Sequence, residues 1–214
     1  MIAIAGETGT GKTTLALSII CEKLAEGRAA AIITTDAPPE AFIERCKSIC
    51  SGIGTSLREE NIFFLDCYSW RVGTNVQKRR EKIISIGGLD NLGALAIKVE
   101  EILERKPALV LLDSLSTFSL HSGEKEVLRF LEVFAGRIRA AGLTAMVIME
   151  SGVQSKEFEK TINSISDGII ETKFNEESDD IVRHMRIRSM KNARHVSKWT
   201  KFAIGENGIN LPPV

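Results

Sequence analysis

One short stretch near the start of the sequence has the residue types and the spacing of a phosphate-binding loop. Residues 6–13 read GETGTGKT and match the pattern G-x-x-x-x-G-K-T at every position. Glycines let the backbone turn tightly and bring its N–H groups against phosphate oxygens. The lysine supplies a mobile cation for the outer phosphates, and the threonine hydroxyl can ligate Mg²⁺. The stretch therefore predicts that the protein binds a nucleoside triphosphate.

The context of this loop supports the same prediction. An apolar run at 2–5 precedes it, and a helix is expected to begin near Lys12, with its positive end toward the phosphates. We expect Lys12 to contribute to catalysis as well as to binding, and Thr13 to be a metal ligand. The predicted nucleotide-binding residues are Glu7, Thr8, Gly9, Thr10, Gly11, Lys12, Thr13 and Thr14.

The magnesium ion of such a site needs an acidic residue at the end of an apolar strand, which orients the ligands around the metal. The run ALVLLD at 108–113 provides Asp113 in that place. Together, the loop and Asp113 predict a nucleoside triphosphate with Mg²⁺. Two other nucleotide-binding classes are excluded, because no H-R-D-type loop of a protein kinase is present and Thr14 occupies the third glycine position of the dinucleotide fingerprint.

The elements that must position these residues follow from the hydrophobic pattern. Nearly continuous apolar runs, typical of parallel strands covered on both faces, lie at 2–5, 30–35, 62–67, 108–113 and 144–150. Amphipathic stretches separate them, which predicts an α/β fold with a mostly parallel sheet flanked by helices. Apolar positions at helical spacing are Leu92, Leu95, Val99 and Ile102, and Val127, Phe130, Leu131, Phe134 and Ile138.

The pattern changes after about residue 166. Short segments separated by the polar turns NEESDD at 175–180 and GENG at 205–208 predict an antiparallel extension on the sheet edge. No repeat or low-complexity linker marks a boundary. Residues 1–214 are therefore expected to form a single domain, with its core at about 1–165 and a β ribbon at about 166–214.

The composition limits the kinds of partner and the cellular compartment that suit this protein. Lysine plus arginine equals aspartate plus glutamate, 28 against 28, so no overall charge points to nucleic acid or membrane. No apolar run approaches the roughly 18 residues of a membrane span. None of the four cysteines forms a C-x-x-C pair, and we expect free, mostly buried thiols in a reducing cytosol. The expected localisation is cytoplasmic.

Taken together, these segments resemble a single-domain KaiC-like ATPase of the RecA superfamily, the group that also holds archaeal RadA, RadB and FlaH. The matching segments, which extend over almost the whole chain, are GETGTGKTTLA, AIITTDAPPEAFIERC, DCYSWRVG, LVLLDSLS and ISDGIIETKF…RIRSMKNARHV. The resemblance implies a RecA-like core that binds ATP with Mg²⁺ and hydrolyses it. It also implies a homo-oligomer, with a hexameric ring as one form, and ATP at the interfaces between subunits.

The terminal ribbon departs from the family's pattern. The resemblance implies an LKMRG-like segment that touches the neighbouring subunit's γ-phosphate, and here Lys191 replaces its arginine and Ser189 its lysine. Such a cation stabilises charge on the transferring phosphoryl group, but a lysine lacks the bidentate fork of arginine. Lys191 is the predicted trans-acting catalytic residue. Arg188 and Arg194 are alternatives, and a basic strand that faces solvent is the plainer interpretation.

The family's water-activating pair of glutamates is also altered. The chain reads TTDAPPE at this point, so Asp36 falls on the first glutamate and Ala37 on the second. Asp36 keeps a carboxylate but is one methylene shorter, and small errors of position lower rates strongly. We predict Asp36 as the catalytic, water-positioning group of a slow reaction. Glu150 is the alternative, whereas Glu40 follows two prolines and is expected to begin a helix.

The leading hypothesis is an Mg-dependent ATPase that acts as an oligomeric regulator or motor. An ATP-binding switch or assembly protein with little hydrolysis is the alternative, which the loss of the second glutamate favours. A RadB-like recombination mediator that binds single-stranded DNA is a further alternative. It would need a basic groove with aromatic residues, which only Tyr68, Trp70, Arg71 and the basic run at 78–82 could form. The neutral charge balance counts against it.

Overall fold

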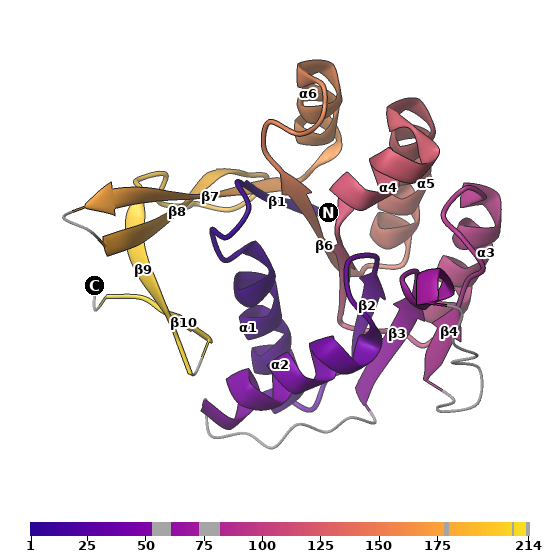
Figure 1. The fold of residues 1–214 in the computed structure, drawn as a ribbon, viewed down its shortest axis with the longest axis horizontal. Helices are drawn as coiled ribbons and strands as arrows, with labels where there is room; N and C mark the ends of the chain where they lie inside the picture. Colours follow the sequence, from indigo (N-terminus) through magenta and orange to yellow (C-terminus); the bar gives the residue numbers. More distant parts are fainter. Residues whose placement is uncertain (53–60, 73–81, 178–179, 207, 213–214) are drawn as a thin grey trace.

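The framework of the protein is one large sheet. The computed structural model describes residues 1–52, 61–72, 82–177, 180–206 and 208–212 of the 214 residues. The described strands lie in the order β10-β9-β8-β7-β1-β6-β5-β2-β3-β4 (Figure 1). Because the central strands pair in parallel, their carboxyl ends lie at one edge of the sheet.

The central strands are parallel. They are β1 (Ile2–Gly6), β2 (Ala30–Thr34), β3 (Ile62–Asp66), β4 (Ile83–Ser85), β5 (Leu109–Asp113) and β6 (Thr144–Glu150). β2 and β5 are buried along their whole length, as expected for strands covered on both faces. The five apolar runs predict five of these strands to within one residue at each end. The pattern does not predict β4, because three residues are too few to show a period.

An antiparallel ribbon extends the sheet beyond β1, on the side opposite β4 (Figure 1). Its strands are β7 (Gly168–Glu177), which is parallel to β1, and then β8 (Asp180–Met190), β9 (Thr200–Gly205) and β10 (Gly208–Asn210). Each of the last three runs antiparallel to the strand before it. This ribbon is the predicted C-terminal extension.

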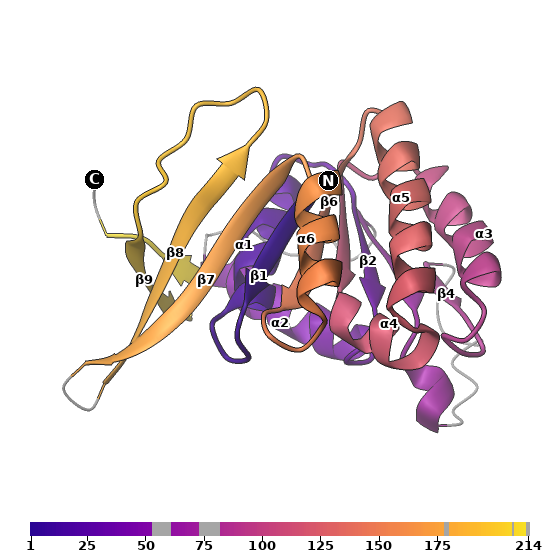
Figure 2. The ribbon, with the colours of Figure 1, turned by 90° about the horizontal axis from the view of Figure 1, so that it is seen from above.

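Helices cover both faces of the sheet (Figure 2). On one face lie α1 (Lys12–Ala25) and α2 (Pro39–Gly52). On the other lie α3 (Leu92–Leu103), α4 (Leu115–Ser122), α5 (Glu124–Ala140) and α6 (Lys156–Ile165). The predicted fold class is therefore confirmed, and α3 and α5 carry the two predicted apolar stripes. Among the described helices, none has the length and apolar character needed to cross a membrane.

The cysteines correct one expectation. Cys21 on α1 and Cys50 on α2 form a disulfide, with their Cα atoms 5.3 Å apart, so the prediction of free thiols is wrong for this pair. The packing of α1 against α2 brings together two residues 29 positions apart, and no sequence spacing signals such a contact. Cys46 and Cys67 are free and buried, as predicted. Burial raises the pKa of Cys46 to about 12 and also raises that of Cys67.

Candidate functional site

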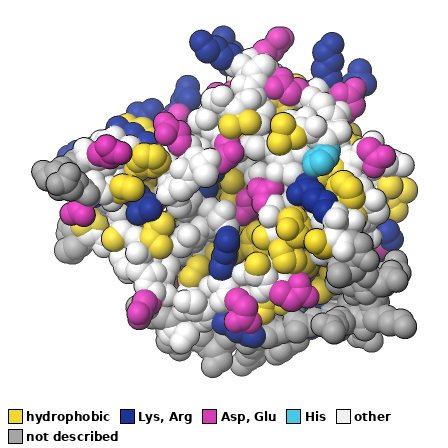
Figure 3. Space-filling view, in the orientation of Figure 1, with side chains coloured by type: hydrophobic (Ala, Val, Ile, Leu, Met, Phe, Trp, Pro, Cys, Tyr) yellow, Lys and Arg dark blue, Asp and Glu magenta, His cyan; other side chains and the backbone are white. Residues whose placement is uncertain are grey.

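A cavity of about 510 Å³ opens at the sheet edge where β1, β2, β5 and β6 end. This is the crevice in which open α/β sheets bind ligands. In the space-filling view (Figure 3), acidic and basic side chains lie close together around a hollow near the middle of the face shown. The charged residues that line the cavity are Lys12, Asp36, Arg45, Asp113 and Glu150.

The predicted phosphate-binding loop connects β1 to α1 at this edge. Gly9 and Gly11 have φ values of 79° and 94°, in the left-handed region that favours glycine. Lys12 is 7% exposed, and its ammonium group donates hydrogen bonds to the carbonyls of Gly6 (2.9 Å) and Glu7 (2.8 Å). Burial lowers the pKa of Lys12, and the surrounding carboxylates oppose that shift. The loop backbone thus holds the lysine at the wall of the cavity.

Most of the predicted binding residues line the cavity: Thr8, Gly9, Gly11, Lys12, Thr13 and Thr14. The side chains of the other two, Glu7 and Thr10, do not. Glu7 is exposed, whereas Thr10 is fully buried with its hydroxyl 2.7 Å from that of Thr172 on β7. Thr10 therefore ties the loop to the neighbouring strand.

Thr13 and Asp113, the two predicted metal ligands, meet in the cavity. The Thr13 hydroxyl donates a hydrogen bond of 2.8 Å to Oδ2 of Asp113, which is 4% exposed. The pKa of Asp113 is raised to about 6, chiefly by burial and also by the charge of Asp36, against the lowering effect of the Thr13 hydrogen bond. A buried carboxylate whose ionised form is disfavoured, beside a hydroxyl oxygen, fits a hard divalent cation.

The chemistry of this donor set fits Mg²⁺ better than a transition metal. Mg²⁺ is usually held by one or two carboxylates together with substrate phosphates. Within the described ranges, no group of three or more His, Cys, Asp or Glu could hold a metal by itself. Thr13 and Asp113 are therefore suited to a cation that takes its other ligands from a nucleotide and water.

Asp36 follows β2 and faces the same cavity. Its Oδ1 accepts hydrogen bonds from the hydroxyls of Thr35 (3.0 Å) and Thr117. Its Oδ2 accepts one from Ser114 (2.8 Å). Three hydroxyls therefore fix the orientation of this carboxylate in the cavity that also holds Thr13 and Asp113.

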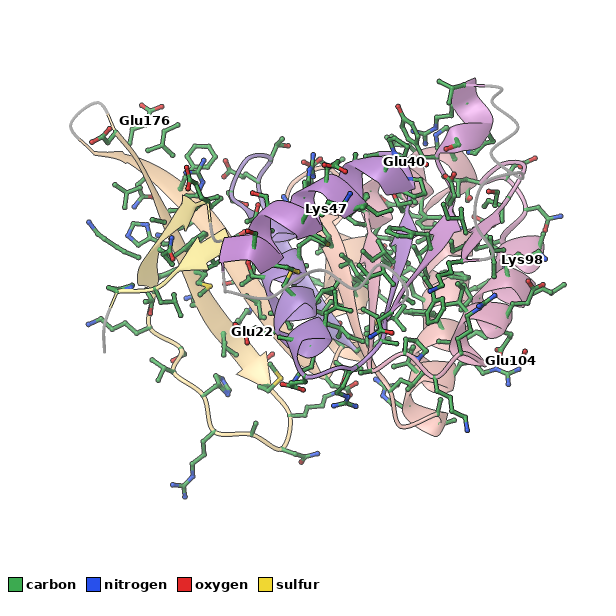
Figure 4. All side chains as sticks on the ribbon, turned by 90° about the horizontal axis from the view of Figure 1, so that it is seen from below. Glu22, Glu40, Lys47, Lys98, Glu104 and Glu176 are labelled. Atoms are coloured by element: carbon green, nitrogen blue, oxygen red, sulfur yellow. A yellow bond between two sulfur atoms is a disulfide. The ribbon has the colours of Figure 1, made fainter. Side chains whose placement is uncertain are left out.

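The other carboxylates near this end of the sheet lie as follows. Glu150 ends β6, lines the cavity and accepts a hydrogen bond from the Thr8 hydroxyl. Glu40 lies in the first turn of α2, as predicted, and is not among the residues that line the cavity (Figure 4). The structure thus brings together Asp36 and Glu150, the two carboxylates considered for the attacking water.

Lys191 lies far from the cavity of its own chain. At the end of β8, Met190 pairs with Gly168, which in turn pairs with Ile2 at the amino end of β1. The cavity is at the carboxyl end of β1, on the opposite edge of the sheet. The Lys191 ammonium lies 3.5 Å from Oδ1 of Asp167. A role of Lys191 at a nucleotide would therefore require a second copy of the chain.

Several residues that the sequence did not predict also line the cavity, among them Arg45, Ser114, Thr117 and Ile204. Ser114 and Thr117 lie within four residues after Asp113, at the end of the same apolar run. Their closeness to Asp113 in the sequence could have predicted that they line the cavity. Arg45 on α2 and Ile204 on β9 have no local signal, because only the packing of α2 and the ribbon around α1 brings them to the loop.

Two of the residues considered for DNA, Trp70 and Arg71, lie on the 3-10 helix η2 (Ser69–Val72), and Tyr68 directly precedes it. The guanidinium carbon of Arg71 lies 5.4 Å from the ring centre of Tyr68 and 5.6 Å from that of Trp70. A guanidinium nitrogen of Arg71 is also 3.1 Å from Nε2 of His121 on α4. Most of the basic run, residues 78–81, lies outside the described residues, so a continuous basic groove stays a prediction.

Comparison with known proteins agrees with this architecture. A family model described as "ATPase: KaiC" matches residues 1–213. A search of the curated proteins finds no match. Among solved structures, the chain is similar to the KaiC-like protein PH0186 of the hyperthermophilic archaeon Pyrococcus horikoshii OT3, with a TM-score of 0.73 and 20% identity over 99% of this chain and 88% of that one. The structural likeness supports the RecA-like fold, and the family match over nearly the whole sequence shows that the chain belongs to the KaiC family of ATPases.

Proposed function

We propose that this protein binds ATP with Mg²⁺ in the described cavity and hydrolyses it slowly, as an oligomeric regulator or motor. The observation that carries the proposal is the hydrogen bond of 2.8 Å between Thr13 and Asp113, in the same cavity as Lys12. Three groups with the chemistry of a magnesium–triphosphate site thus line one cavity, although Thr13 and Asp113 are 100 residues apart in the sequence.

Each group has a defined part in this proposal. The N–H groups of the loop and the positive end of α1 bind the phosphates. Lys12 leaves its two carbonyl partners for the outer phosphate oxygens, and Thr13 and Asp113 hold the metal, which when bound neutralises charge on the phosphates. Asp36 orients the attacking water by accepting one of its hydrogen bonds. Lys191 of a neighbouring copy supplies the last cation.

A single-turnover hydrolysis assay tests the enzymatic part. Asp36→Asn is expected to bind MgATP as the wild type does, and to lose hydrolysis by about 10- to 100-fold because a positioned general base contributes that much or more. Glu40→Gln, which removes a nearby carboxylate outside the cavity, is the matched control and should keep the wild-type rate. Failure of the wild type to bind MgATP would reject the proposal as a whole.

The hydrogen bonding of Asp36 also favours a second candidate, an ATP-dependent switch that hardly hydrolyses its ligand. Both carboxylate oxygens of Asp36 already accept hydrogen bonds from hydroxyls, and Ala37 offers no second carboxylate. Equal, near-background hydrolysis by the wild type and Asp36→Asn, with intact MgATP binding, would select the switch over the ATPase.

A further inference from the structure

Arg45 is a cation of the cavity for which the sequence motifs give no role. It lies on α2 and lines the cavity together with Lys12, Asp36 and Asp113. Its guanidinium carbon is 6.0 Å from the ring centre of Phe42, which lies almost one turn earlier on the same helix and is 2% exposed. At this distance the aromatic face can support the guanidinium without neutralising its charge.

The N–H donors of Arg45 are available to a ligand. No described residue gives the guanidinium a hydrogen bond or an ion pair, whereas the Lys12 ammonium is held by two carbonyls. A planar guanidinium offers paired N–H groups that match the spacing of phosphate oxygens. Arg45 therefore brings to the cavity wall a guanidinium that has no hydrogen-bond partner among the described residues.

The charge balance of the cavity indicates why a second cation is needed. Among its described lining residues, the three carboxylates Asp36, Asp113 and Glu150 outnumber the two cations Lys12 and Arg45. Without Arg45, one lysine would face three carboxylates, and the excess of negative charge would repel a triphosphate. Arg45 thus offsets charge that the metal-binding and water-positioning groups introduce.

The location of Arg45 points to the outer end of the triphosphate. α2 follows β2, whose end carries Asp36, so the same β2–α2 unit presents both residues to the cavity. The guanidinium therefore enters the cavity from the same unit as Asp36, on the side proposed for the metal and the terminal phosphate.

We propose that Arg45 binds the terminal phosphate of the nucleotide from within the same chain. The inference rests on the proposed MgATP binding and adds a cation that needs no neighbouring subunit. In this arrangement Lys12 and Arg45 contact the terminal phosphate from two sides of the cavity. Loss of Arg45 should therefore weaken the binding of a triphosphate much more than that of a diphosphate.

Calorimetric titration with the magnesium complexes of ATPγS and ADP tests this inference. Arg45→Ala is expected to weaken ATPγS binding about tenfold, the effect of losing one charged hydrogen-bonding group, and to change ADP binding by less than about twofold. Arg45→Lys should lie between the wild type and Arg45→Ala. Lys47→Ala removes a cation from the same helix outside the cavity (Figure 4) and should change neither affinity.

The outcomes separate this inference from the proposed function. An unchanged ratio of the two affinities in Arg45→Ala, through no loss or an equal loss for both nucleotides, overturns the role at the terminal phosphate and leaves MgATP binding intact. Absence of nucleotide binding by the wild type overturns both. Circular dichroism establishes that the variants are folded, and if Arg45→Ala does not fold, the affinity ratio of Arg45→Gln decides in its place.

Discussion

Thr13 and Asp113 are joined by a hydrogen bond of 2.8 Å across 100 residues of sequence. The bond connects the first turn of the helix after the phosphate-binding loop to the last residue of β5. Without a metal, the buried Asp113 carboxylate has a raised pKa of about 6. The ionised form of Asp113 therefore lowers the stability of the folded protein, and the proposed cation would offset that cost.

Asp113→Asn should stabilise the unliganded protein at neutral and alkaline pH. Because the folded-state pKa of about 6 lies above the ordinary aspartate value of 3.8, the contribution of Asp113 to stability is greatest below pH 3.8 and is lost as the pH rises through 6. Asparagine is neutral throughout, so we expect a gain of about 2 to 3 kcal/mol at pH 8 that disappears near pH 4. Urea unfolding at the two pH values measures it, and a loss of stability at pH 8 would contradict the prediction.

Lys12→Met should remove most of the affinity for MgATP. Methionine keeps much of the buried aliphatic stem but cannot contact phosphate oxygens, and we expect binding to weaken by about 10- to 100-fold. Isothermal titration measures the change. Lys98→Met, at a partly exposed lysine on α3, is the control and should bind MgATP normally. Wild-type affinity in Lys12→Met would place the nucleotide elsewhere.

Gly11→Ala should destabilise the protein more than Gly27→Ala. Both glycines have positive φ, 94° and 74°, and alanine costs about 1 to 2 kcal/mol in this region. A Cβ at Gly11 would in addition lie 2.8 Å from Cδ1 of Ile204, whereas one at Gly27 would meet nothing within 4 Å. Chemical unfolding measures the difference. Adding Ile204→Ala should reduce the extra loss of stability in Gly11→Ala. An unchanged loss would show that the Ile204 side chain does not crowd a Cβ at position 11.

Lys191→Ala should bind MgATP but lose hydrolysis by at least about tenfold, because the lysine would act on the nucleotide of a neighbouring copy. Mixing it with Lys12→Met provides the sharper test, since one variant then carries an intact cavity and the other an intact Lys191. Mixed oligomers should recover part of the activity that each variant lacks alone. Native mass spectrometry with and without MgATP follows assembly, and a persistent monomer would assign Lys191 to the surface.

The local features of the fold could be predicted well because they depend on residues close together in sequence. The phosphate-binding loop, Asp113 at the end of its strand and the five apolar runs each show their pattern within a few residues. β4 is too short to show one. The antiparallel ribbon was also predictable, because its strands are consecutive and separated by polar turns.

The sequence by itself therefore determined the class of fold and the residues suited to hold a triphosphate, since hydrophobic period and loop chemistry are local properties. The tertiary structure alone decided which distant groups surround them. It placed Arg45 in the same cavity as Asp113, surrounded Asp36 with three hydroxyls and joined Cys21 to Cys50. It also put Lys191 at the opposite edge of the sheet. These relationships arise from the crossing of helices and the direction of strands, and they cannot be predicted from the spacing of residues along the chain.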